Sequence, residues 1–249
     1  MTTHAAAPSP VPSPVSVLLE NGIARIALDD GKANAINPRL LGGIAAALDR
    51  AEQEQASGVV LHGRSGCLSG GLDLKTLPAL PPEALREALS LFTEVMLRIF
   101  TFPRPVVIAA TGHAIAGGAV LALTGDERFG AEGAFRVGLN ETAIGLSLPR
   151  FVVEMAERSL PASSLHRVLL TGELFDPAEA RRLGLLDRVL PPADLLAEAI
   201  ARAELLAQLP KAAYADNKRA LRVAAAERGR AAWQGELEAF MQRFVALAR

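Results

Sequence analysis

The chain has 249 residues, of which 50% are hydrophobic and 21% are charged. This length and apolar content exclude a chain that is disordered throughout, and they allow a core that needs no disulfide or structural metal. With 26 basic and 27 acidic side chains, the protein has no overall field that would attract nucleic acid or an anionic membrane. Cys67 is the single cysteine, which excludes a disulfide framework and favours a cytoplasmic location.

The first expected elements are a tail and a hairpin. Residues 1–14 contain four prolines and no lysine or arginine, so we expect a disordered tail and no secretory signal there. Residues 15–20 and 23–29 alternate apolar and polar side chains on either side of Asn21-Gly22, a dipeptide typical of tight hairpin turns. A β-hairpin is therefore expected at the start of the folded region.

Helices and strands alternate after the hairpin. Asn37 followed by Pro38 is a helix N-cap signal and predicts a helix over residues 37–55. Residues 58–62 form a short apolar run that predicts a strand. Apolar side chains at helical spacing then predict a helix over residues 85–99.

Residues 105–125 form an uncharged run that is long enough to span a membrane. His113, several glycines and the lack of a lysine or arginine bias in the flanks argue against a span. We therefore predict a buried strand over residues 106–110, a glycine-rich turn, and a helix that begins at Gly117 or Gly118.

The last third of the chain is predicted to be helical. The pattern changes near Pro149 from an α/β region to helices, and no linker or internal repeat divides the chain. Residues 211–249 carry eight basic and four acidic side chains, a local charge of +4 that is typical of a solvated helix face. The expected helices cover residues 151–160, 163–170, 177–183, 193–209, 211–225 and 234–248.

Two glycine loops are the first candidates for chemistry. One covers residues 64–74 and holds three glycines, and the other covers residues 116–119. A glycine loop alone is usually structural. Both loops, however, follow predicted strands, and the second opens a helix whose free N–H groups favour negative charge. Together such N–H groups can form an oxyanion hole.

Several common catalytic motifs are absent from the sequence. It contains no G-x-S-x-G nucleophile elbow, no G-K-[ST] phosphate loop and no G-x-G-x-x-G motif after the first strand. The histidines at positions 4, 62, 113 and 166 show no zinc-ligand spacing, so no metal site is expected. Carboxylates therefore remain as the candidate bases.

Five segments resemble the motifs of one enzyme family and occur in that family's order. They are DDGKANAINPRLL, SGCLSGGLDL, ATGHAIAGGAVLALTGDERF, GLNETAIGLSLP and LLTGELFDPAEARRLGLLDRVLP. On these motifs the chain is similar to the enoyl-CoA hydratase/isomerase (crotonase) superfamily over about residues 15–249.

The resemblance implies an α/β fold in which residues 15–190 form a crotonase-like spiral of ββα units. The C-terminal helical region, residues 191–249, would then assemble a homotrimer or a dimer of trimers. The resemblance also implies an acyl-CoA thioester substrate, with coenzyme A as part of the substrate and no separate cofactor. No nucleic-acid or membrane partner is expected.

Site residues carried over from the family are mostly backbone groups. The oxyanion donors match the N–H groups of Leu72 and Gly117, which would stabilise a thioester enolate. Basic residues of the C-terminal region, either Lys218 or Arg243, are expected near the CoA phosphates. The positions that match the family's CoA groove are Ala33, Ala35, Gly70, Gly71 and Leu74.

Hydratases of the family use two glutamates, whereas this sequence matches only one of the two positions. Val120 stands at the first position and Glu141 at the second. A single carboxylate is enough to move a proton from C2 to C4 through an enolate, and the G-L-N-E-T word resembles the Δ3,Δ2-enoyl-CoA isomerases. We expect such an isomerase with Glu141 as its acid and base. A hydratase and a non-catalytic binding protein of the same fold are the alternatives.

Three further side chains near the glycine loops are expected to be structural. Asp73 would accept hydrogen bonds from the backbone of its own loop. Cys67 would be a buried small side chain, and His113 a hydrogen-bonded loop residue.

Overall fold

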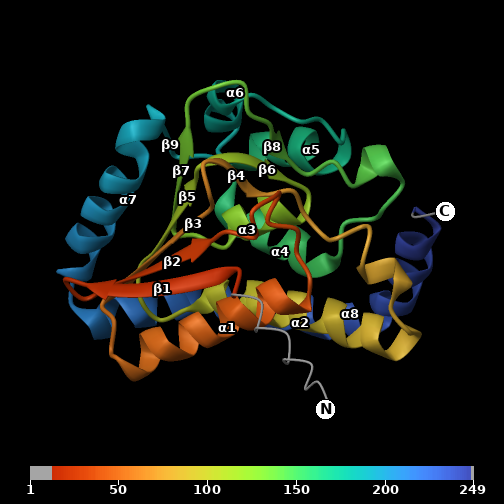
Figure 1. The fold of residues 1–249 in the computed structure, drawn as a ribbon, viewed down its shortest axis with the longest axis horizontal. Helices are drawn as coiled ribbons and strands as arrows, with labels where there is room; N and C mark the ends of the chain where they lie inside the picture. Colours follow the sequence, from red (N-terminus) through yellow and green to blue (C-terminus); the bar gives the residue numbers. More distant parts are fainter. Residues whose placement is uncertain (1–12, 248–249) are drawn as a thin grey trace, which may run out of the picture.

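The computed structural model describes residues 13–247 and arranges them as two β-sheets with helices around them (Figure 1). The predicted tail, residues 1–14, lies outside the described residues except for Ser13 and Pro14. The Pro14 carbonyl accepts a hydrogen bond of 2.8 Å from the Asp29 N–H. This bond ties the start of the described chain to the end of the hairpin.

The larger sheet has six strands in the order β1-β2-β3-β5-β7-β9. β1 and β2 form the predicted antiparallel hairpin, and Asn21 and Gly22 in its turn have φ angles of 51° and 76°, the positive values that such a turn requires. All other neighbouring strands in this sheet are parallel. Its strands are β1 (Val15–Glu20), β2 (Ile23–Leu28), β3 (Gly58–His62), β5 (Val106–Ala110), β7 (Glu127–Ala131) and β9 (Arg188–Leu190).

The smaller sheet has three parallel strands, β4 (Gly66–Ser69), β6 (Gly112–Ile115) and β8 (Val137–Gly138). Each of β3, β5 and β7 in the larger sheet is followed along the chain by a strand of the smaller sheet and then by a helix. The predicted spiral of ββα units is therefore confirmed.

Two sequence-based expectations for this region were wrong. The expected loop over residues 64–74 contains β4, and the expected glycine-rich turn after residue 110 contains β6. These strands are four residues long and begin with glycine, so they are too short to show an alternating pattern.

Most helices begin and end close to their predicted positions. Asn37 caps the first helix, and its side chain accepts hydrogen bonds of 3.1 Å from the N–H groups of Arg39 and Leu40. No helix among residues 13–247 is long and apolar enough to cross a membrane. The helices are α1 (Pro38–Gln53), α2 (Pro82–Thr101), α3 (Gly117–Leu123), α4 (Arg150–Ser159), α5 (Ala162–Leu170), α6 (Pro177–Arg182), α7 (Pro192–Ala207) and α8 (Lys211–Ala246), with 3₁₀ turns η1 (Leu77–Ala79) and η2 (Thr142–Ile144).

The larger sheet separates two apolar layers. Helix α7 covers one face, where its Leu195, Ala199 and Ala203 are buried against Val60 and Val107 of the sheet (Figure 1). The main core fills the space between the other face and helices α1 to α4. Full burial of a leucine or phenylalanine side chain in such a core stabilises the fold by about 1.5–3 kcal/mol.

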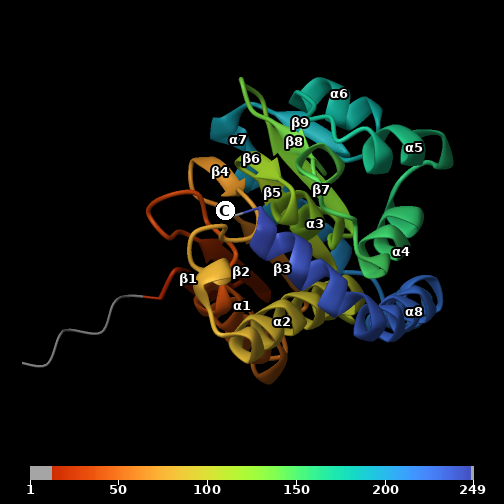
Figure 2. The ribbon, with the colours of Figure 1, turned by 90° about the vertical axis from the view of Figure 1, so that its right-hand side faces the viewer.

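Helix α8 is one continuous helix of 36 residues, where two separate helices were expected. The segment between the two expected helices, residues 226–233, is rich in good helix formers. Its one glycine, Gly229, lies directly against α4, because a Cβ atom there would be 2.6 Å from the Phe151 Cα. The helix therefore continues, and it packs against α2 and α4 (Figure 2).

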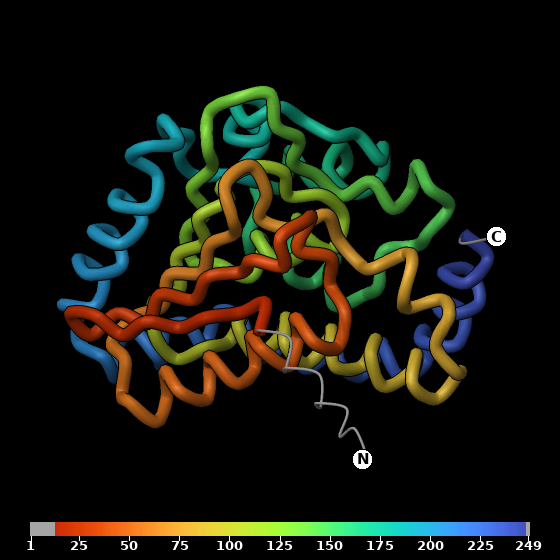
Figure 3. Tube along the Cα trace, viewed as in Figure 1, coloured from red at the N-terminus to blue at the C-terminus, as the bar shows by residue number. Residues whose placement is uncertain are grey.

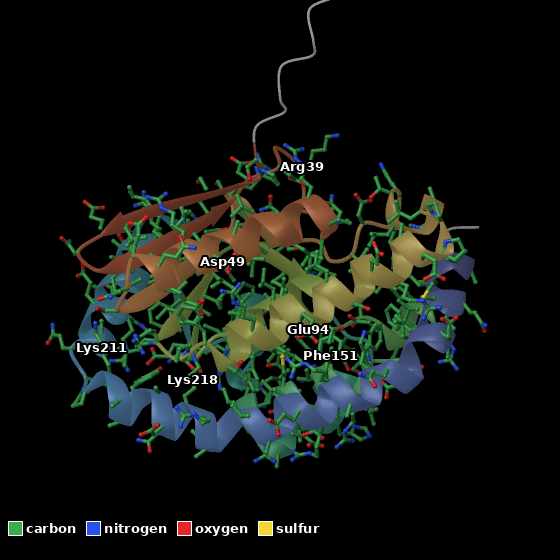
Figure 4. The ribbon with its side chains drawn as sticks, turned by 90° about the horizontal axis from the view of Figure 1, so that it is seen from below. Arg39, Asp49, Glu94, Phe151, Lys211 and Lys218 are labelled. Atoms are coloured by element: carbon green, nitrogen blue, oxygen red, sulfur yellow. The ribbon has the colours of Figure 1, made fainter. Side chains whose placement is uncertain are left out.

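A buried ion cluster anchors the first half of α8. The Lys218 ammonium donates a hydrogen bond of 2.7 Å to one carboxylate oxygen of Asp126, and Arg222 lies 3.1 Å from the other. Burial lowers the pKa of Lys218 to about 8, although the Asp126 charge opposes this change. The expectation that this segment is simply a solvated face was wrong for these two basic residues. Figure 4 shows Lys218 where α8 meets the body of the molecule.

Candidate active site

The three strands of the smaller sheet end at one place. β4 pairs with β6 through Ser69 and Ala114, and β6 pairs with β8 through Ile115 and Gly138. Because all three strands are parallel, the segments that follow them emerge side by side. Those segments carry the residues matched to the family's site, which are Leu72 after β4, Gly117 after β6 and Glu141 after β8.

The two expected oxyanion donors lie next to each other. A Cβ atom on Gly117 would be 3.4 Å from the Leu72 nitrogen and 3.3 Å from the Gly71 Cα. Within residues 13–247 neither the Leu72 N–H nor the Gly117 N–H donates a hydrogen bond to another residue. Two neighbouring free donors of this kind can stabilise a negatively charged oxygen.

The backbone is held in unusual conformations beside both donors. Gly71 has a φ of 93°, and a Cβ atom there would lie 3.0 Å from the Ile115 oxygen and 3.1 Å from the Gly117 nitrogen. Ala116 has φ 50° and ψ −120°, a conformation that costs a non-glycine residue about 1–3 kcal/mol. The smaller sheet holds Ala116 in this strained conformation, because the Ala116 N–H donates a 2.9 Å hydrogen bond to the Gly138 carbonyl.

A side-chain network that sequence reasoning missed orients the first donor loop. The Ser69 hydroxyl donates to the Asn34 carbonyl at 2.7 Å and accepts from the Gly71 N–H at 3.1 Å. The fully buried Asn34 side chain donates to the Leu28 and Leu68 carbonyls, each at 3.0 Å. These bonds hold the loop after β2 against β4. The only sequence signal for this network was a serine, Ser69, directly before the glycine pair of the loop.

Glu141 is a buried carboxylate with an incomplete set of hydrogen bonds. It directly precedes η2, its side chain is 7% exposed, and its Oε2 has no hydrogen-bond partner among the described residues. Burial raises the pKa of Glu141 to about 7, and a hydrogen bond from its own backbone N–H only partly opposes this change. A carboxylate with such a pKa can both accept and return a proton near neutral pH.

A mostly apolar cavity of about 150 Å³ connects the donors and the carboxylate. Gly70 and Leu74 are exposed and mark its mouth, while Phe92 and Phe244 are buried lining residues. In Figure 3 the loop after β4 and the end of α8 meet on the same side of the molecule. Of the described residues that line the cavity, only Glu141 is ionisable.

Comparison with known proteins shows which family the chain belongs to. A sequence model described as enoyl-CoA hydratase/isomerase matches residues 19–247. The chain belongs to the enoyl-CoA hydratase/isomerase family. The members of this family are enzymes. The match confirms the family resemblance seen in the motifs and the fold that this resemblance implies.

Relatives of the chain within the family include proteins described as hydratases and as isomerases. A putative enoyl-CoA hydratase of Thermus thermophilus is 36% identical over 77% of this chain and 78% of its own length. A probable enoyl-CoA hydratase of Mycobacterium tuberculosis has a TM-score of 0.86 at 33% identity, covering 91% of this chain and 96% of its own. The human mitochondrial Δ3,Δ2-enoyl-CoA isomerase has a TM-score of 0.85 at 28% identity, covering 94% and 92%. These relatives therefore do not decide between hydration and isomerisation as the reaction of this chain.

Of the five residues matched to the family's CoA groove, two line the cavity, Gly70 and Leu74. Gly70 lines the mouth, and its N–H donates a 2.8 Å hydrogen bond to the Ala33 carbonyl. The Ala35 N–H donates to the Asp30 carboxylate at 3.2 Å. Gly71 and Leu74 lie on the loop that carries the first donor. A role in CoA binding stays a prediction for all of these positions.

Asp73 and Cys67 have the structural contacts expected of them, and His113 is hydrogen-bonded as expected but lies in a strand. The Asp73 carboxylate accepts 3.0 Å hydrogen bonds from the Lys75 and Thr76 N–H groups. Burial alone would raise the pKa of Asp73, but hydrogen bonds from the side chain and N–H of Thr76, the Lys75 N–H and the Asn37 side chain lower it overall. Cys67 is buried, with its pKa raised mainly by desolvation. His113 lies in β6 rather than in a loop, and its Nδ1 accepts a 3.1 Å hydrogen bond from the Arg136 N–H.

The two candidates for the CoA phosphates differ in position. Lys218 is 5% exposed and paired with Asp126, away from the described cavity lining, so its assignment to the phosphates was wrong. Arg243 is exposed and donates a hydrogen bond to the Ser147 hydroxyl. A phosphate contact for Arg243 stays a prediction. Formal charge could not distinguish the two, because burial depends on packing between distant segments.

Two further residues of the cavity were not identified from the sequence. Asn140 lines the cavity, and its buried Oδ1 has no hydrogen-bond partner among the described residues. Phe240 reaches the cavity from α8. Among residues 13–247 there is no group of three or more histidine, cysteine or acidic side chains that could hold a metal ion.

Proposed function

We propose that this chain is a Δ3,Δ2-enoyl-CoA isomerase. The thioester carbonyl oxygen of a 3-enoyl substrate accepts hydrogen bonds from the Leu72 and Gly117 N–H groups. The Glu141 carboxylate removes a proton from C2, and the electron pair forms an enolate on that oxygen. The protonated Glu141 then returns its proton to C4 as the double bond moves to C2–C3. The reaction consumes no water and needs no cofactor, because the proton taken from C2 is returned to C4.

The observation that carries this proposal is the pairing of one carboxylate with an otherwise uncharged lining. Glu141 and Val120 both line the cavity, and Val120, which is 2% exposed, is the residue that the family resemblance matches to the hydratases' other glutamate. Addition of water needs a base for the water and an acid for the carbon, which two carboxylates provide. Movement of one proton between two carbons needs only one group that accepts and then donates.

The raised pKa of Glu141 also supports the proposal. With a pKa of about 7, a useful fraction of the enzyme holds the ionised base at neutral pH, and the conjugate acid is strong enough to protonate C4. A surface glutamate would be ionised but would be a weaker base.

The proposal is tested by supplying 3-hexenoyl-CoA to the pure protein. The expected product is 2-hexenoyl-CoA, identified by its unchanged mass and by the ultraviolet absorbance of the conjugated thioester. A product heavier by one water, formed directly from 2-hexenoyl-CoA at a comparable rate, would favour the hydratase instead. Tight binding of the thioester without any product would favour the non-catalytic alternative.

A further inference from the structure

A second cavity lies beside the catalytic one and shares a wall with it. The second cavity has a volume of about 270 Å³ and is lined in part by Ser147, Trp233 and Arg243. Phe240 and Pro149 line both cavities. These two side chains therefore form the partition between them, and Phe240 is the larger of the two.

The catalytic cavity alone has room for a short acyl chain. Its volume is about 150 Å³, and an apolar cavity of about that size holds a guest as large as benzene, with six carbons. With the thioester carbonyl at the Leu72 and Gly117 donors, the acyl chain extends along the apolar part of the cavity lining, which includes Phe240. A chain of about six carbons fills this space.

Aromatic neighbours hold Phe240 in its position. Its ring lies 5.4 Å from the Trp233 ring in an edge-on arrangement and 6.0 Å from the Phe244 ring in a stacked one. Trp233 in turn lies 5.8 Å from Phe151 of α4. Such ring pairs add to the packing of α8 and fix the Phe240 side chain as a rigid wall.

We propose that Phe240 sets the chain-length limit of this enzyme and restricts it to short-chain acyl thioesters of about six carbons or fewer. The inference rests on the proposed function only in placing the thioester carbonyl at the two N–H donors. Removal of the Phe240 ring joins the catalytic cavity to its neighbour, which admits longer chains. Phe240 is thus a specificity-determining residue and takes no part in proton transfer.

The test measures binding of saturated acyl-CoA thioesters from four to twelve carbons by titration calorimetry. These ligands have no double bond, so failure of the isomerase proposal leaves the measurement intact. In the wild type, affinity should rise by about fourfold per methylene up to about six carbons, the gain expected for a buried methylene, and then stop rising. Affinity that keeps rising through ten carbons would overturn the proposal.

The variant Phe240→Ala should raise affinity for the ten-carbon thioester by about tenfold or more and change that for the six-carbon one by less than about threefold. The matched control is Phe135→Ala, because Phe135 is half-buried, packs on His113 and lines neither cavity. It should leave the profile unchanged. Equal changes at all chain lengths in Phe240→Ala would contradict the proposal. If that variant does not fold, Phe240→Leu and the wild-type profile supply the same test.

Discussion

The two sides of the catalytic cavity are built in different ways. In the proposed mechanism the oxyanion side, residues 69–72 and 116–118, acts through backbone N–H groups that are held by the pairing of β4 with β6 and by Ser69. The base side, lined by Val120, Glu141 and Phe240, is proposed to act through side chains. A substitution on the base side can therefore change the reaction or the substrate while the fold and the enolate chemistry remain.

The largest expected effect is on the base side. Glu141→Gln keeps the size of the side chain but cannot accept a proton, so the kcat of isomerisation should fall by about 10²-fold or more. Binding of a saturated acyl-CoA should change by less than about threefold, because the oxyanion donors are untouched. Steady-state kinetics and calorimetry on one preparation measure both. Retention of most of the activity would make Glu141 a structural carboxylate.

The pH dependence of the wild type sharpens the assignment. Glu141 must be ionised to remove the C2 proton, and burial raises its pKa to about 7. Below that pH the ionised fraction falls about tenfold per unit, so kcat/KM at pH 5.5 should be roughly 30-fold below its plateau. Rates over pH 5–9 with an uncharged-chain substrate measure the profile. A plateau that extends down to pH 5 would show that the base is a different, unperturbed carboxylate.

A smaller loss is expected when the oxyanion side is distorted. Gly71→Ala places a Cβ atom 3.0 Å from the Ile115 oxygen at a φ of 93°, which should shift the neighbouring donor and lower kcat by about tenfold or more. Leu72→Ala is the matched control, because only the backbone of Leu72 is used, and its kcat should stay within about threefold. Equal losses in the two variants would mean that the Leu72 side chain matters as much as the backbone geometry.

The buried carboxylate should also reduce the stability of the folded protein. Because the folded pKa of about 7 exceeds the ordinary value of 4.5, the folded state binds more protons between these values, and stability falls as pH rises through that window. Glu141→Gln should therefore be about 3 kcal/mol more stable than the wild type at pH 8, with about half that difference at pH 5.5. Urea unfolding measures it. A difference that stays the same from pH 5.5 to pH 8 would contradict this account.

Prediction from the sequence succeeded where short motifs determine the local backbone. Asn21-Gly22 identified the hairpin, Asn37-Pro38 identified the start of α1, and the helix after the second glycine loop begins at Gly117 as expected. The position of Glu141 came from the family resemblance, and the structure places it in the same cavity as the two donors.

Features that depend on contacts between distant segments were missed. The strands β4, β6 and β8 are too short to show a pattern on their own, and they are stabilised by pairing with one another. The continuity of α8 depends on how Gly229 meets Phe151, and the burial of Lys218 depends on Asp126. Trimer formation, the domain division and the cellular location stay predictions.

The measurement that tests the central claim most directly is the ratio of two initial rates on one preparation, hydration of 2-hexenoyl-CoA against isomerisation of 3-hexenoyl-CoA. With Val120 in place of a second carboxylate, the ratio should be below about 0.01, since a missing acid–base group costs at least about 10²-fold. Val120→Glu, which adds a carboxylate one helical turn beyond the Gly117 donor, should raise the ratio. A wild-type ratio near or above one would contradict the single-carboxylate account and identify a hydratase.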